Sequence, residues 1–322
     1  MLFRTTFEIP ALQRAIDLNS KILLLGSCFT EHIGGLLQKN KFNAAVNPSG
    51  ILFHPLAIAR SIERGLDIDT PSPDTFFQSA GAYRHFDFHS ELSHPELPVA
   101  LEQVQKAVMQ MHQALQDSTH IIISFGTSLI YEDVRTGIPV SNNHKLPANR
   151  FRKRQLSVEE IVHVWQSIMD RVDSRNTIEW IFTVSPVRHI REGIVQNMRS
   201  KSVLIEAVHR LLQFRSSVSY FPAYEVMMDD LRDYRFYAED MVHPSAVAIE
   251  YIWEQFSTKA IDNSAQNWIA KWHPVLQALE HRPFFPESPE HQAFRKSRYA
   301  LLKDLHAAYP QLDLSQELAF FS

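Results

Sequence analysis

The sequence predicts a doubly wound α/β fold, in which helices flank a mostly parallel sheet. Two apolar runs, residues 22–25 and 120–125, each end at a glycine, and such runs are typical of strands buried on both faces. Stretches with helical spacing of apolar residues alternate with these runs along the chain. In this architecture the ligand site lies beyond the carboxyl ends of the strands, where Gly26 and Gly126 fall.

The remaining elements continue the alternation. A helix is expected over residues 31–39, directly after the first strand, and another over 101–115, before the second strand. Ser157 and Glu160 have the spacing of a capping box, which predicts the start of a helix. Residues 178–184 and 218–224 are expected to be strands, with a helix through 204–212 between them.

Two regions interrupt this pattern. Residues 71–98 are rich in Pro, Ser, His and aromatic side chains without helical period, and we interpret them as an inserted loop or hairpin that overhangs the site. Residues 263–322 read as a helical appendage. We therefore expect an α/β domain over residues 1–262, followed by this C-terminal appendage.

Charge and composition exclude several classes of function. The 322 residues include 32 Lys and Arg against 36 Asp and Glu, a net charge of −4, so no nucleic-acid partner is expected. The dense basic cluster, residues 150–154, is interpreted as a solvated loop. No apolar stretch approaches the roughly 20 residues of a membrane span, and no signal-peptide run begins the chain. We expect a cytoplasmic protein without a membrane partner.

The single cysteine, Cys28, stands where the first strand turns into a helix. One cysteine allows no internal disulfide, cysteine-based zinc cage or iron–sulfur cluster, and no cofactor is predicted. A helix N-terminus and a nearby imidazolium both lower the pKa of a thiol, so a Cys28–His243 pair could be charged near neutral pH. The structural alternative is a small core residue.

The segment Asp240-x-x-His243 places an acid and a base three residues apart. Asp240 can hold one imidazole nitrogen and leave the other for a nucleophile, as in a catalytic triad. Pro244 suits the first position of a helix, so we expect His243 to cap its start. An N-terminal cap with a surface histidine is the alternative without catalysis.

Two further clusters of polar residues stand out. His144 lies with Asn142, Asn143 and Lys145 in a polar loop, either a solvated turn or a binding site for a polar substrate group. If residues 84–89 are extended, one face carries His85, Asp87 and His89, a conceivable metal triad. No helical His-x-x-x-His pattern supports a metal, and we predict no metal site.

Several blocks resemble a known family. Gly26-Ser27-Cys28-Phe29-Thr30 resembles the signature of the GSCFA family, a bacterial group placed with the SGNH/GDSL hydrolase-like folds. Residues 47–51, 125–128, 142–145, 185–188 and 237–245 resemble further blocks of that family in the same order. The resemblance covers about residues 1–260 and implies an SGNH- or flavodoxin-like three-layer fold.

The resemblance also implies a function, a hydrolase or acyltransferase acting on an ester, thioester or similar acyl bond of a small molecule or carbohydrate. The catalytic residues it implies are Cys28 as the nucleophile, with Ser27 as the alternative, and Asp240 and His243 as the base. Gly50, Gly126 and Ser128 would join the Cys28 amide in the oxyanion hole, although Ser128 stands where the family fold has asparagine. The implied substrate-binding residues are Asn47, His89, Asn142, His144 and Lys145. A non-catalytic binding module and a metal-dependent hydrolase using His85, Asp87 and His89 are the alternatives.

Overall fold

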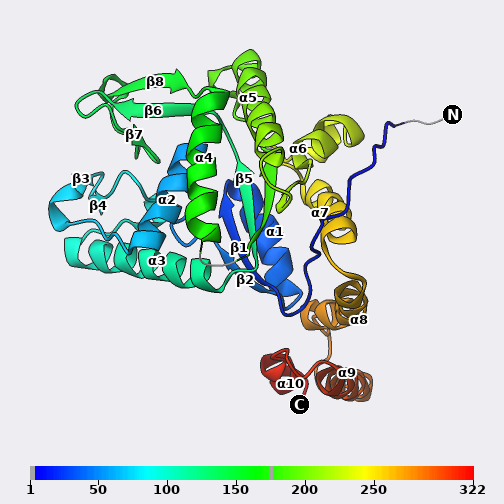
Figure 1. The fold of residues 1–322 in the computed structure, drawn as a ribbon. Helices are drawn as coiled ribbons and strands as arrows, with labels where there is room; N and C mark the ends of the chain where they lie inside the picture. The colour runs from blue at the N-terminus through cyan, green and yellow to red at the C-terminus, as the bar shows by residue number, and fades with distance from the viewer. Residues whose placement is uncertain (1–3, 175–176) are drawn as a thin grey trace.

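A computed structural model describes residues 4–174 and 177–322 and contains a central five-stranded parallel sheet (Figure 1). Its strand order is β10-β9-β5-β1-β2, so the first strand lies inside the sheet and β2 forms one edge. The strands are β1 (Lys21–Gly26), β2 (Asn43–Val46), β5 (His120–Phe125), β9 (Glu179–Val184) and β10 (Val218–Tyr220). The predicted parallel sheet flanked by helices is confirmed, whereas β2 was not anticipated and β10 is shorter than predicted.

Alternate side chains of each strand enter different cores. Leu23 and Leu25 of β1 pack into the core formed with α2 to α5, whereas Ile22 and Leu24 pack against α1 and α7. Burial on both faces explains why β1 is apolar at successive positions. The helices are α1 (Cys28–Lys39), α2 (Pro55–Asp67), α3 (Leu97–Asp117), α4 (Val158–Asp173), α5 (Ile194–Leu212), α6 (Ala223–Glu225) and α7 (Ala246–Ala260). The capping box predicted at Ser157 and Glu160 is present at the start of α4.

The C-terminal helices are α8 (Asn263–Glu280), α9 (Pro289–Ala308) and α10 (Ser315–Phe321), and they lie at the opposite end of the molecule from α4 and α5 (Figure 1). Two stacked tryptophans of α8 attach this region to α1. The indole of Trp268 donates to the carbonyl oxygen of Asn40 at 2.8 Å, and that of Trp272 donates to Lys39 at 2.9 Å. The appendage therefore satisfies carbonyl groups left free where α1 ends.

Two small sheets extend from the main one. The inserted residues 71–98 contain a hairpin of β3 (Phe77–Ser79) and β4 (Ala82–Arg84). Between β5 and α4, β6 (Leu129–Asp133) pairs with β7 (Pro139–Val140) and β8 (Phe151–Gln155). The prediction of a solvated loop at 150–154 is wrong, because this cluster forms most of β8. Glu132 on β6 pairs with Arg152 and Arg154 of that strand. Asp133 pairs with Arg150 and Glu192 with Lys153, so each basic side chain of the run has an acidic partner.

Across residues 4–174 and 177–322, none of the helices combines the length and the apolar character that crossing a bilayer requires.

Candidate functional site

The turn between β1 and α1 is fixed by contacts from two neighbouring strands. Asn47, directly after β2, accepts the Gly26 amide at 2.9 Å through its side-chain oxygen, and the Ser27 amide donates to Ser124 of β5 at 3.2 Å. Gly26 has a φ of +137°, and a β-carbon there would lie 2.2 Å from the Ser124 carbonyl oxygen. Only glycine fits this approach of the two strands. Asn47, predicted to bind substrate, instead holds the turn.

Ser27 and Cys28 have different surroundings. Ser27 is buried, caps α1 by accepting the Phe29 amide, and hydrogen-bonds the Ser124 hydroxyl at 3.0 Å. Cys28 is half-buried, and within the described chain its amide, at the first position of α1, has no acceptor other than its own thiol. Burial and the nearby Glu31 carboxylate raise the pKa of the Cys28 thiol, although its own amide opposes them. This direction is opposite to the lowering expected for the thiol, because burial and a like charge outweigh the hydrogen bond from the Cys28 amide.

Two residues one turn further along α1 share the face of Cys28. Helical spacing places Glu31 at i+3 and His32 at i+4. Burial and then Glu91 raise the pKa of Glu31, while a hydrogen bond to Asn47 opposes them. Burial and then the charge of His243 lower the pKa of His32. His243 therefore lies close to the helix face that carries Cys28.

The predicted pair of Asp240 and His243 forms one compact loop. Asp240 Oδ2 lies 2.6 Å from His243 Nδ1, and its Oδ1 accepts the amides of Val242 and His243 at 2.9 and 3.0 Å. These hydrogen bonds lower the pKa of Asp240 to about 2. An ionised carboxylate only accepts, so Nδ1 carries the hydrogen and Nε2 remains free. The prediction that His243 caps the start of α7 is wrong, because Ser245 supplies that cap through its hydroxyl.

This loop is attached to the carboxyl end of β9. The Arg188 amide donates to the Val242 carbonyl at 3.0 Å, and its guanidinium donates to the Met241 carbonyl at 3.1 Å. His189 follows Arg188 in the chain, and the charge of His243 contributes to lowering the pKa of His189. Within the described residues, no hydrogen bond joins Cys28 to His243. The two predicted catalytic segments follow β1 and β9 at the same edge of the sheet.

The predicted oxyanion-hole residues already have partners. The Gly50 amide donates to Asn47 at 2.7 Å, and the Gly126 amide donates to Phe53 at 2.8 Å. Ser128 is fully buried, and its hydroxyl donates to Ser200 of α5. Of the donors predicted from the sequence, the Cys28 amide alone has no acceptor on another residue within 4–174 and 177–322.

The insertion approaches the site at Gly50, where a β-carbon would lie 2.3 Å from Cβ of His89. His89 Nδ1 is 3.5 Å from a Glu91 oxygen. The insertion therefore brings an imidazole and a carboxylate to the same edge of the sheet.

The polar loop after β7 is folded inward. His144 is buried, with Nδ1 3.2 Å from the Ser90 hydroxyl and Nε2 2.8 Å from the His85 carbonyl, and burial lowers its pKa to about 4. Asn142 donates to Ser90 at 3.2 Å, whereas Lys145 is exposed. His144 and Asn142 thus hold the insertion in place.

The alternative of a metal triad on one face of residues 84–89 is contradicted. Only residues up to Arg84 are extended, and residues 86–88 form a turn, so His85, Asp87 and His89 do not alternate on one strand. Asp87 is buried and pairs with Arg60 and Arg64, each at 2.7 Å. Among the described residues, no group of three His, Cys, Asp or Glu is arranged to hold a metal ion.

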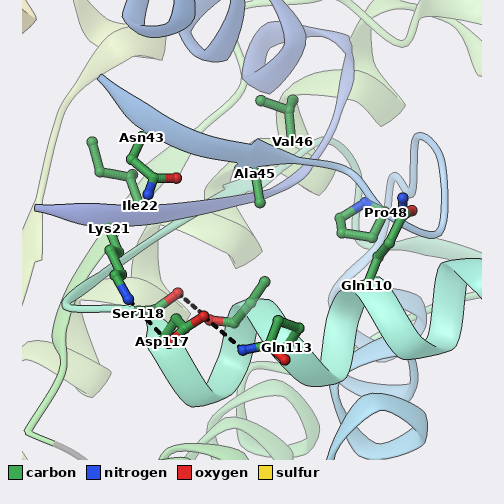
Figure 2. Close-up of a pocket in the computed structure, with 11 residues that line it drawn as sticks. Lys21, Ile22, Asn43, Ala45, Val46, Pro48, Gln110, Gln113, Asp117 and Ser118 are labelled. Carbon is green, nitrogen blue, oxygen red and sulfur yellow. Dashed lines mark hydrogen bonds and ion pairs between the residues drawn. The ribbon is translucent and has the colours of Figure 1, made fainter. Parts of the chain in front are cut away.

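Two hollows bear on where a ligand would bind. One, of about 280 Å³, lies beside Gly126 and is lined by Phe53, Thr127, Leu129, Tyr131, Val140, Asn142, Asn143, Lys153 and His189, among others. The other, of about 400 Å³, follows edge strand β2 and helix α3, and Figure 2 shows Lys21, Asn43 and Asp117 at one end of it. Lys21 and Asn43 begin β1 and β2, so that hollow extends to the edge opposite Cys28 and is not assigned to the site.

Four residues of this site were not singled out from the sequence, namely Glu31, His32, His189 and Lys201. Lys201 of α5 is fully buried, and its Nζ donates to the carbonyl oxygens of Gly126 at 2.8 Å and Ser185 at 2.7 Å. Helical spacing from Cys28 could have identified Glu31 and His32. His189 and Lys201 acquire their positions through contacts distant in the sequence.

The fold and this edge define an α/β protein that carries a cysteine turn and an Asp–His loop at the carboxyl ends of a parallel sheet. The chain belongs to the GSCFA family, whose family model matches residues 21–256. A second model, the C-terminal domain of GSCFA domain proteins, matches residues 272–322. No curated protein matches the sequence.

Proposed function

We propose that this chain is an SGNH-like hydrolase or acyltransferase that cleaves an acyl ester or thioester through Cys28. The observation that carries the proposal is the hydrogen bond between Asp240 and His243, which leaves Nε2 free in a loop fixed to the end of β9. The strand order, with the nucleophile turn directly after an interior first strand, supports the SGNH-like assignment.

The raised pKa of Cys28 determines the order of proton transfer. A protonated thiol needs a base during attack, so His243 Nε2 takes the proton as the S–C bond forms and the carbonyl becomes an oxyanion. The oxyanion then reforms the carbonyl, the bond to the leaving group breaks, and that group receives the proton from His243. Water or an acceptor alcohol next attacks the thioester while His243 takes its proton. The C–S bond then breaks, and His243 returns the proton to the Cys28 sulfur.

Cys28 is preferred over Ser27 as the nucleophile. Ser27 is 1% exposed, and its hydroxyl is engaged by Ser124 and by the amide that it caps. Cys28 is more accessible and follows the turn that Gly26 makes possible. The substrate class that we propose is a small-molecule or carbohydrate acyl ester.

A panel of p-nitrophenyl esters and acyl thioesters of different chain length tests this function. We expect turnover in the wild type and in Ser27→Ala, and its loss in Cys28→Ala and His243→Ala. His273→Ala is the matched control, since His273 is exposed on α8 and should leave turnover unchanged. Turnover that persists in Cys28→Ala would contradict the proposal.

A second candidate, a binding module without catalysis, is favoured by the engaged donors at Gly50, Gly126 and Ser128. Losing one oxyanion donor costs about 2.7–4 kcal/mol of transition-state stabilisation. Saturable binding of the same esters without turnover in the wild type would select this candidate.

A further inference from the structure

His189 has a buried imidazole nitrogen without a partner. It follows β9, its ring meets Phe53 edge-on at 5.5 Å between centroids, and its backbone amide donates to Asn197 at 2.8 Å. Its Nε2 is buried and, within the described residues, forms no hydrogen bond. A buried polar atom without a partner costs about 1–3 kcal/mol, so this nitrogen is expected to meet a group that is absent from the protein.

The nitrogen packs closely against a glycine that leaves no room for a side chain. A β-carbon at Gly126 would lie 3.1 Å from His189 Nε2 and 2.9 Å from the Phe53 carbonyl oxygen. Lys201 fixes both sides of this contact, because it binds the carbonyl oxygens of Gly126 and Ser185. The turn after β5 and the segment leading to His189 are therefore held in a defined geometry.

The ring is neutral over the working pH range of most proteins. Burial, the Lys201 ammonium and His243 lower the pKa of His189 to about 3. A neutral imidazole with hydrogen on Nε2 donates to an uncharged oxygen and offers no net charge to an anion. This chemistry suits a carbonyl oxygen rather than a phosphate or carboxylate.

The adjoining pocket agrees with such a ligand. Its walls include Phe53, Leu129, Tyr131 and Val140, and its volume is about 280 Å³. Ligand pockets usually measure roughly 300–1,000 Å³, so this one suits a short acyl group. His189 lines the pocket, and the charge of His243 contributes to lowering the pKa of His189.

We propose that His189 donates a hydrogen bond from Nε2 to the carbonyl oxygen of a short-chain acyl substrate seated in the pocket beside Gly126. His189 thereby takes the place of the donor that Ser128, engaged by Ser200, does not supply. This inference rests on the proposed acyl chemistry at Cys28. It assigns the reaction a catalytic residue that touches the substrate.

The test compares two reactions of the same thiol. Acylation by p-nitrophenyl butyrate, followed as the burst of p-nitrophenol, needs a donor for the oxyanion, whereas alkylation by iodoacetamide does not. In His189→Phe the ring that packs on Phe53 remains but the donor is lost. We expect acylation to fall about 10²- to 10³-fold, mainly in kcat, with alkylation within twofold of wild type. His189→Gln, which restores an N–H donor, should recover part of the acylation rate.

The controls separate the outcomes. His163→Ala, an exposed histidine on α4, should change neither reaction. Acylation of His189→Phe at the wild-type rate would overturn the role of His189 and leave the proposed function standing. A wild-type protein that is alkylated but not acylated by any ester would overturn both proposals. Equal losses in acylation and alkylation would identify His189 as structural and also overturn the inference.

Discussion

Asp240 binds His243 twice, through its imidazole Nδ1 at 2.6 Å and through its backbone amide at 3.0 Å. One carboxylate therefore folds the loop and orients the ring that the loop presents. Because Asp240 and His243 lie three residues apart on one short turn, the orientation of the imidazole depends little on the rest of the fold.

Replacing Asp240 by Asn is expected to reduce acyl turnover roughly 10²- to 10⁴-fold, since the amide permits the wrong imidazole tautomer. The pKa of Asp240 is about 2, so its carboxylate stays ionised at higher pH and adds no limb to the wild-type rate profile above about pH 3. Steady-state kinetics from pH 4 to 9 check both statements. Asp229→Asn, an exposed acidic residue outside the site, serves as the control. Unchanged turnover in Asp240→Asn would exclude the pair as the base.

Gly26→Ala is expected to destabilise the fold by about 2–4 kcal/mol, because the new β-carbon meets the Ser124 carbonyl at 2.2 Å in a backbone region unfavourable for alanine. Gly35→Ala in the adjacent helix is the matched control. A β-carbon at Gly35 has no neighbour within 4 Å, and alanine there should stabilise by about 0.5–1 kcal/mol. Urea unfolding measures both. Similar stabilities for the two variants would show that the turn tolerates a side chain.

Continuous apolar runs made β1, β5 and β9 predictable, because strands buried on both faces need apolar side chains at successive positions. The edge strand β2, with sequence Asn-Ala-Ala-Val, lacks that signal. β8 was misassigned because its basic side chains pair with carboxylates of Glu132 and Glu192, which lie outside the run and are not part of its local pattern.

In the candidate site, too, only the features with a local sequence pattern were predictable. The cysteine turn and the Asp-x-x-His loop are local patterns, so both were predictable. The raised pKa of Cys28 follows from burial and from Glu31, which the helix N-terminus alone does not indicate. The His189 ring packs against Phe53 and Gly126, each more than 60 residues away in the chain. No local sequence pattern indicates these contacts.

Glu31→Gln is expected to lower the pKa of the Cys28 thiol, since burial remains but the nearby carboxylate charge is removed. Alkylation by iodoacetamide between pH 7 and 8 should then become severalfold faster, because the thiolate is the reactive form. Glu254→Gln, on the exposed face of α7, should leave the rate unchanged. A slower reaction in Glu31→Gln would instead identify Glu31 as a group that assists deprotonation of the thiol.

Asp87→Asn is expected to destabilise the protein by about 2–4 kcal/mol, because Arg60 and Arg64 lose a shared buried carboxylate. This loss of stability is smaller than that expected for a fully buried ion pair, because both arginines retain some solvent exposure. Burial alone would raise the pKa of Asp87, but Arg60, His85 and Arg64 hold it below its usual value. The ion pairs therefore contribute fully above the unfolded pKa of about 3.9, and their contribution is lost as pH falls through the lower folded pKa.

Urea unfolding of wild type and Asp87→Asn at pH 7 and at pH 3 measures this contribution. Asp69→Asn is the control, since exposed Asp69 binds the same Arg64 and should change stability by less than about 1 kcal/mol. The difference between wild type and Asp87→Asn should shrink at the lower pH. Addition of EDTA should leave the wild-type curve in place, because arginines occupy both oxygens of Asp87. A wild-type protein destabilised by EDTA would contradict this assignment of the Asp87 carboxylate.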